Sequence, residues 1–144
     1  MARSGLPASL ADWLIDWVIG EYGSRWRFTV SKPVAHYSAS HRVGNLMFVS
    51  GQLGLEDGAL VKGVSAQTRQ ALVNLVAVLD DGGASLSDVA KCTVFMVDIE
   101  DFATVNGIYA EVFGEHRPAR SAIAVAALPL GGLVEIEAYV VFGS

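Results

Sequence analysis

The sequence has few of the features that mark secreted, metal-binding or nucleic-acid-binding proteins. Cys92 is its only cysteine, which excludes a disulfide framework and a cysteine-rich metal site. The three histidines lack the spacing of metal ligands, so we do not expect zinc; they are His36, His41 and His116. Charged residues make up only 17% of the chain, the net charge is −5, and the basic residues are scattered. This argues against nucleic acid as a partner.

The chain also lacks a long hydrophobic run. No apolar stretch reaches the roughly 20 residues that are needed to span a bilayer. Arg3 precedes an apolar stretch near the N-terminus, but Asp12 and Asp16 interrupt it and no small-residue cleavage pattern follows. We therefore expect no secretion signal and no membrane partner. With the single cysteine, this favours a cytoplasmic location.

Hydrophobic residues, by contrast, are abundant. They make up 52% of the 144 residues, which is more than a single domain of this size can hide in its own core. Part of this apolar surface is therefore expected to lie between subunits of a homo-oligomer.

The spacing of apolar residues predicts an amphipathic helix over residues 9–22, within an N-terminal extension over residues 1–26, followed by one domain over residues 27–144. The expected strands of this domain span residues 27–31, 37–43, 46–50, 89–97, 120–127 and 133–142. Helices are expected over 65–79 and from Ile99 or Phe102 to Phe113, ended by Gly82-Gly83 and by Gly114. This order, β-β-β-α-β-α-β-β, is an α+β arrangement with two helices against one mixed sheet. Two helices can cover only one face of this sheet. The small apolar residues expected on its other face favour contact with a second subunit there.

Arg120 has the most unusual surroundings in the sequence. Alternation along its strand places it on one face with Ala122, Ala124 and Ala126, while Glu135 and Glu137 share a face of the last strand. One interpretation is a structural Arg–Glu ion pair, which composition alone favours. The other is that Arg120 keeps donors free for a bidentate contact with a ligand carboxylate.

No familiar catalytic motif decides between the two interpretations. Ser50 and Ser121 have no neighbouring His–Asp pair. Cys92 lies mid-strand among apolar residues, where a buried and inert thiol is expected. The glycines form neither a phosphate loop nor a dinucleotide fingerprint.

From about Val34 to Phe142 the sequence resembles the Rid/YjgF family of reactive-intermediate deaminases. The strongest match is Pro118-Ala119-Arg120-Ser121, followed by Val125, Leu128-Pro129 and Val134-Glu135-Ile136-Glu137-Ala138. Supporting matches are Gly44-Asn45, Val49-Ser50-Gly51-Gln52, Gln67, Gln70, Asn74-Leu75, Asp101-Phe102, Asn106 and Tyr109. The resemblance implies a chorismate-mutase-like fold and a homotrimer with barrel-like packing of its sheets. It also implies active sites in the clefts between neighbouring subunits.

The resemblance further implies an activity. It is the hydrolysis, without metal or cofactor, of small 2-imino or enamine acids such as 2-iminobutyrate and 2-iminopropionate to 2-oxo acids and ammonia. By position, Arg120 matches the arginine that binds the substrate carboxylate in the family. Glu135 matches the family's glutamate that helps place the hydrolytic water, and Tyr37 matches its tyrosine near the start of the domain. Ser50 and Asn106 match residues that line or support the cleft, and Ser121 next to the arginine is a further substrate-binding candidate.

Two other functions stay open for this fold. One is a non-catalytic module that binds small carboxylates or acts as a chaperone-like surface. The other is an endoribonuclease or translation inhibitor, which the acidic charge and the absence of a basic groove disfavour.

The chain also departs from the family pattern with Ala35-His36 in place of Gly-Pro, Ala122 in place of cysteine, and Ala124 in place of a polar residue. These changes leave the carboxylate clamp intact and affect the shape of the pocket.

Overall fold

The computed structural model describes residue 30 and residues 32–143. The expected helix over residues 9–22, the expected N-terminal extension as a whole, and all but one residue of the expected strand 27–31 lie outside the described residues.

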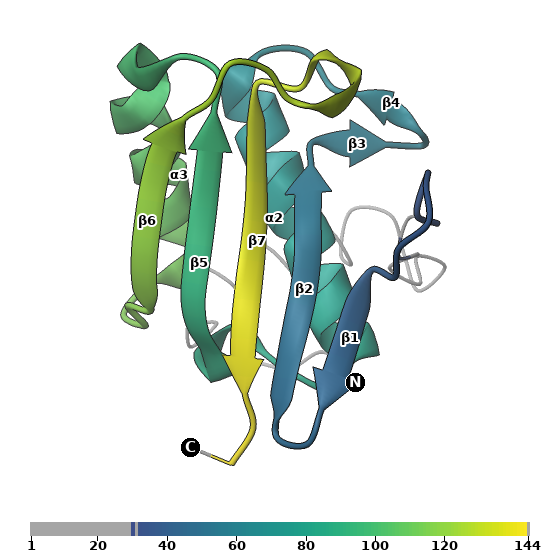
Figure 1. The fold of residues 1–144 in the computed structure, drawn as a ribbon. Coiled ribbons are helices and arrows are strands. Elements are labelled where there is room, and N and C mark those ends of the chain that lie inside the picture. The colour runs from purple at the N-terminus through teal and green to yellow at the C-terminus, as the bar shows by residue number, and fades with distance from the viewer. Residues whose placement is uncertain (1–29, 31, 144) are drawn as a thin grey trace, which may run out of the picture.

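The described residues form a five-stranded sheet with two helices behind it (Figure 1). In spatial order its strands are β1 (Ser40–Val43), β2 (Leu46–Leu53), β7 (Val134–Val141), β5 (Val89–Met96) and β6 (Ala119–Ala124). The helices are α2 (Val64–Asp81) and α3 (Phe102–Phe113). Only β5 and β6 pair in parallel; the other neighbours are antiparallel. The predicted α+β fold, with two helices on one face of a mixed sheet, is confirmed.

The core lies between the sheet and the two helices. Residues of β7 alternate between the faces, as predicted, and the four that point toward the helices are fully buried: Val134, Ile136, Ala138 and Val140. They meet the apolar stripe of α2, whose buried residues include Ala71, Leu72, Leu75, Val78 and Leu79. Gly114, at a φ of 61°, follows the last residue of α3, which is where the sequence predicts the helix to end.

Several element boundaries differ from the expected ones. The first described strand begins at Ser40 rather than at Tyr37, because residues 34–37 form a series of bends instead of an extended strand. Strand β2 continues past Ser50 to Leu53 through a bulge between Val49 and Gln52. Strand β6 ends at Ala124 instead of Ala127, before a loop with a short 3-10 turn over Pro129–Gly131. Two further 3-10 turns, Leu86–Asp88 and Ile99–Asp101, precede β5 and α3.

A turn at Asp57-Gly58 joins two short strands that the sequence pattern does not indicate. These are β3 (Leu55–Glu56) and β4 (Ala59–Leu60), which pair antiparallel beyond the end of β2. Asp57 and Gly58 have φ angles of 51° and 81°, the left-handed pair that a tight two-residue hairpin requires. Strands of two residues are too short to show alternation.

The face of the sheet opposite the helices, here called the open face, is turned toward the reader in Figure 1. No helix or strand of the described residues covers it. Large apolar side chains are nonetheless exposed there: Val43, Leu46, Phe48, Ile123 and Tyr139 are each at least 40% exposed. A row of this kind on a sheet is typical of an interface.

Candidate active site

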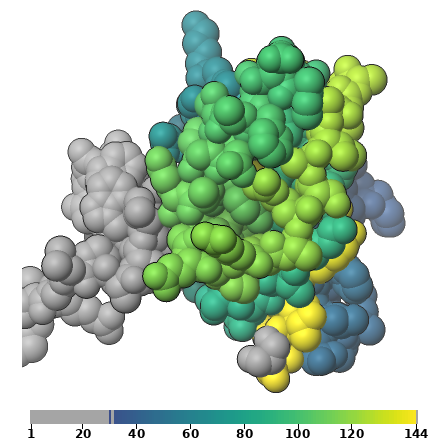
Figure 2. Space-filling view, turned by 90° about the vertical axis from the view of Figure 1, so that its left-hand side faces the viewer, coloured from purple at the N-terminus to yellow at the C-terminus, as the bar shows by residue number. Residues whose placement is uncertain are grey.

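Arg120 lies near the start of β6, at one edge of the sheet, and its side chain points toward α3. In the parallel register it stands beside Cys92 of β5, on the face that the helices cover. Its Nη1 donates a hydrogen bond of 2.9 Å to Oδ1 of Asn106. Its guanidinium carbon lies 4.7 Å from the ring centroid of Tyr109 and 5.8 Å from that of Phe102. Figure 2 looks onto this edge of the molecule, where α3 and β6 form the green surface.

The charge of Arg120 is not neutralised by a carboxylate of the described chain. The ion pair that forms within residues 30 and 32–143 is that of Arg69 with Glu111, on the exposed surface. The interpretation of Arg120 as half of an Arg–Glu ion pair is therefore not supported within these residues. Its side chain has five N–H donors, and the single hydrogen bond to Asn106 uses one. A half-buried guanidinium with donors to spare is suited to bind an organic anion.

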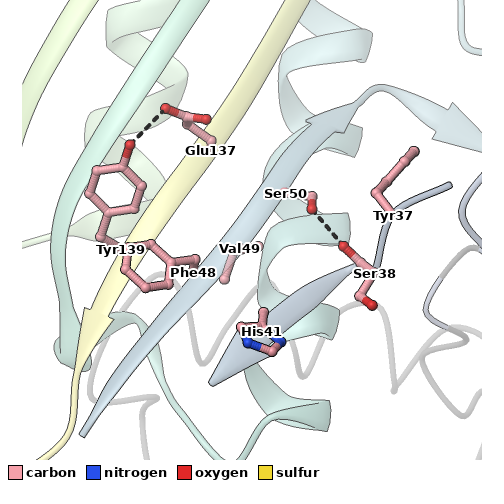
Figure 3. Close-up of a pocket in the computed structure, with 8 residues that line it drawn as sticks. All are labelled: Tyr37, Ser38, His41, Phe48, Val49, Ser50, Glu137 and Tyr139. Carbon is pink, nitrogen blue, oxygen red and sulfur yellow. Dashed lines mark hydrogen bonds between the residues drawn. The ribbon is translucent and has the colours of Figure 1, made fainter. Parts of the chain in front are cut away.

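Tyr37 and Ser50 lie together in a different place, a hollow of about 390 Å³ on the open face (Figure 3). The Ser50 hydroxyl donates a hydrogen bond of 2.6 Å to the carbonyl oxygen of Ser38, which ties the segment before β1 to β2. The other residues that line the hollow are His41, Phe48, Val49, Glu137 and Tyr139. The Tyr139 hydroxyl donates a long hydrogen bond of 3.4 Å to Glu137.

Glu135 is next to this hollow, on the same face of β7 as Glu137. Its side chain lies directly over Gly51 of the β2 bulge, where an added Cβ would come within 2.7 Å of the Glu135 carboxyl carbon. Burial raises the pKa of Glu135 above its usual value, and the negative charge of Glu137 raises this pKa further. A carboxylate with a raised pKa is a better proton acceptor for a water molecule than an exposed one.

A single chain does not bring Arg120 to these residues. Strands β1 and β6 are the two edges of the sheet, and four strand spacings of roughly 4.8 Å put them about 19 Å apart. Glu135 is separated from β6 by the whole of β5, and it points to the open face whereas Arg120 points to α3. The site residues thus form two groups. The first, the arginine group, is Arg120 with Asn106; the second, the glutamate group, is Tyr37, Ser50 and Glu135.

Ser121 belongs to neither group. It pairs in register with Thr93, so its side chain is on the open face, opposite to that of Arg120. Cys92 is fully buried, as predicted, and burial raises the pKa of its thiol to about 11.

Two neighbours of Arg120 were given no role from the sequence. Phe102 lies about one turn before Asn106 and Tyr109 about one turn after it, on the same side of α3, and both rings approach the guanidinium. The available signal was a polar Asn106 in the middle of an otherwise apolar helical stripe.

The described residues contain no group of three or more His, Cys, Asp or Glu side chains that could hold a metal ion. Neither described helix is both long enough and apolar enough to cross a membrane.

A family model described as Endoribonuclease L-PSP matches residues 29–142. The chain belongs to this family, also known as Rid/YjgF. The Rid/YjgF chain is 44% identical over 120 residues to the 2-iminobutanoate/2-iminopropanoate deaminase of Bos taurus, a match that covers 80% of this chain and 88% of the bovine one.

Solved structures agree with the fold of this Rid/YjgF chain. The YjgF gene product of E. coli is 37% identical, with a TM-score of 0.74 over 79% of this chain and 98% of the other. E. coli TdcF with bound serine is also 37% identical, with a TM-score of 0.72 over 76% and 90% of the two chains. The predicted family and fold are confirmed.

Proposed function

We propose that this Rid/YjgF chain is a hydrolase that converts small 2-imino acids to 2-oxo acids and ammonia. The observation that carries the proposal is the guanidinium of Arg120, which has no carboxylate partner among the described residues and has donors available for a substrate carboxylate. The name of the bovine relative supports the substrate class. TdcF supports the binding of a small molecule with a carboxylate, because its structure holds serine.

The proposed active site is shared between subunits. The arginine group of one copy would meet the glutamate group of a second copy, since the two lie at opposite parts of the same sheet. The exposed apolar side chains of the open face would supply the interface between copies. We propose a closed homotrimer as the assembly. We also propose that the protein is cytoplasmic.

The chemistry needs little from the protein besides positioning. A protonated imine carbon is already electrophilic, and two parallel hydrogen bonds from Arg120 to the carboxylate would hold it in front of one water molecule. Glu135 would accept a proton as the water oxygen bonds to that carbon, and Tyr37 would orient the reactants. The resulting carbinolamine loses its nitrogen as ammonia when the carbonyl forms, so one water is consumed and no metal or cofactor takes part.

The test is an imine-decay assay. Threonine and a dehydratase generate 2-iminobutyrate in situ, and its decay is followed with the wild-type protein, Arg120→Ala and Arg69→Ala. Arg69 is the matched control, because it is an arginine in an exposed ion pair with Glu111 and belongs to neither group of site residues. We expect faster decay with wild type and Arg69→Ala, and no acceleration with Arg120→Ala. Equal decay in all three would remove the enzyme proposal.

A non-catalytic binding role is the second candidate, favoured by the serine held in TdcF. In that case wild type would bind 2-oxobutyrate in calorimetry through Arg120, yet leave the rate of imine decay unchanged.

A further inference from the structure

Arg120 is held by one side of helix α3 through neutral groups. Phe102, Asn106 and Tyr109 recur at helical spacing, and each contacts the guanidinium: Asn106 by a hydrogen bond and the two rings by their faces. We call these three residues the α3 cradle. None of them carries a negative charge, so the cradle orients the cation without cancelling it.

Within the cradle, the Tyr109 ring is the closer and the more rigid surface. Its centroid lies 4.7 Å from the guanidinium carbon, compared with 5.8 Å for Phe102. Tyr109 is only 7% exposed, and its ring stacks on Phe113 at 4.5 Å. Phe102, in contrast, is 41% exposed. Because the Tyr109 ring is buried and packs against Phe113, it is better placed than the exposed Phe102 ring to hold the guanidinium in one orientation.

The hydroxyl of Tyr109 is buried in an unusual environment. No nitrogen or oxygen of the described residues partners this buried oxygen; the group against it is the Cys92 thiol. Burial raises the pKa of Tyr109 far above its usual value, and the Cys92 thiol adds to the rise. A tyrosine with the ordinary pKa of about 10 is already neutral near pH 7. The raised pKa of Tyr109 extends this neutral range further, so the ring adds no negative charge beside Arg120.

We propose that Tyr109 is a positioning residue, whose ring face holds the Arg120 guanidinium in the orientation that binds a substrate carboxylate. The contribution comes from the ring, while the hydroxyl packs against Cys92 and does not contact the ligand. This inference rests on the proposed function only in the identity of the ligand, a small 2-oxo or 2-imino carboxylate.

The test compares three variants on the full-length protein. Tyr109→Phe keeps the ring, Tyr109→Leu removes it, and Phe113→Leu makes the same aromatic-to-leucine change at an equally buried position that does not contact Arg120. Binding of 2-oxobutyrate is measured by calorimetry, KM and kcat by the imine assay, and unfolding by a thermal melt.

We expect Tyr109→Phe to bind 2-oxobutyrate within about twofold of wild type, and Tyr109→Leu to bind about tenfold more weakly, the range of a partly desolvated cation–π contact. KM should rise by a similar factor with little change in kcat, because the contact exists before and during the reaction. Both leucine variants should melt earlier than wild type. Phe113→Leu should lose clearly less affinity than Tyr109→Leu, because it removes a neighbour of the Tyr109 ring but leaves the ring itself against Arg120.

Three results would overturn the inference. They are equal affinity for Tyr109→Leu and wild type, an equal loss for Phe113→Leu and Tyr109→Leu, and a wild type that does not bind 2-oxobutyrate at all. Failure of the proposed function looks different: the wild type would bind 2-oxobutyrate with the expected dependence on Tyr109 but would not accelerate imine decay.

Discussion

Asn106 accepts a hydrogen bond from Arg120 at 2.9 Å, in the place where a carboxylate would form an ion pair. An amide oxygen fixes the direction of the guanidinium but leaves its positive charge available. Asparagine at this position therefore separates two tasks, orientation and neutralisation, that an aspartate would perform together.

Replacing this amide with a carboxylate tests whether the free charge matters. Asn106→Asp should form an ion pair with Arg120 and weaken 2-oxobutyrate binding by about tenfold or more, because the ligand must then compete with an internal anion. The melting temperature should stay equal or rise. Asn106→Ala is the control, since it removes the hydrogen bond without adding charge, and it should bind more tightly than the aspartate variant. Unchanged affinity in Asn106→Asp would contradict the proposed role of Arg120.

A shared active site predicts complementation between two inactive proteins. Arg120→Ala and Glu135→Gln are each expected to be inactive. If the two are denatured and refolded together in equal amounts, half of the arginine groups and half of the glutamate groups are intact, so about a quarter of the sites regain both. Imine decay should return to about a quarter of the wild-type rate. A mixture that stays inactive although its subunits have exchanged would show that the two groups do not meet.

The pKa of Glu135 predicts the acid side of the pH profile. Burial and the charge of Glu137 both raise this pKa, and the reaction needs the ionised form, so activity should fall as the pH drops through it. Glu137→Gln removes the like charge and lowers the Glu135 pKa. The acid limb of kcat/KM should therefore move to lower pH in this variant. A shift to higher pH, or none, would contradict the assignment of the base.

The raised pKa of Glu135 also makes the stability of the fold depend on pH. A carboxyl group whose pKa is higher in the folded than in the unfolded chain stabilises the fold at low pH, and this contribution is lost as the pH rises through the folded-state pKa. Glu135→Gln does not ionise. Relative to wild type it should gain stability as the pH rises through that value, which thermal melts across the acid range can follow.

The close approach of Gly51 to Glu135 can be tested with one methyl group. A Cβ at Gly51 would overlap the Glu135 carboxylate and force it out of its place. We expect Gly51→Ala to lower kcat by about tenfold or more, as displacement of a positioned group does. Gly107→Ala is the control, because nothing lies within 4 Å of the added atom in α3 and alanine favours a helix. Equal activity in both variants would remove Glu135 from the reaction.

Much of the fold could be predicted from the sequence because one face of the sheet is buried. Strand β7 alternates Val134, Ile136 and Ala138 with Glu135 and Glu137, and burial of the apolar set leaves only one choice of faces. The helices were predicted because their apolar stripes contact the same core. The hairpin at Asp57 was missed as a pair of strands, since it has no face to bury.

The candidate site could be predicted only in part. Alternation tells which face a residue occupies, but not which strands adjoin. The last two strands are neighbours in sequence, yet β5 lies between them, which separates Arg120 from Glu135. That separation depends on a parallel pairing between distant segments, and no local pattern carries it. The contact of Asn106 with Arg120 likewise depends on how α3 packs behind β6.

Cys92 is the chain's single thiol, and it is fully enclosed between β5 and α3, with a pKa near 11 that leaves almost no reactive thiolate. A maleimide or disulfide dye can therefore attach only when the sheet and helix part. The rate of labelling under native conditions would measure how often that opening occurs. The protein thus carries a natural probe of local opening on the strand beside Arg120, with no engineered label needed.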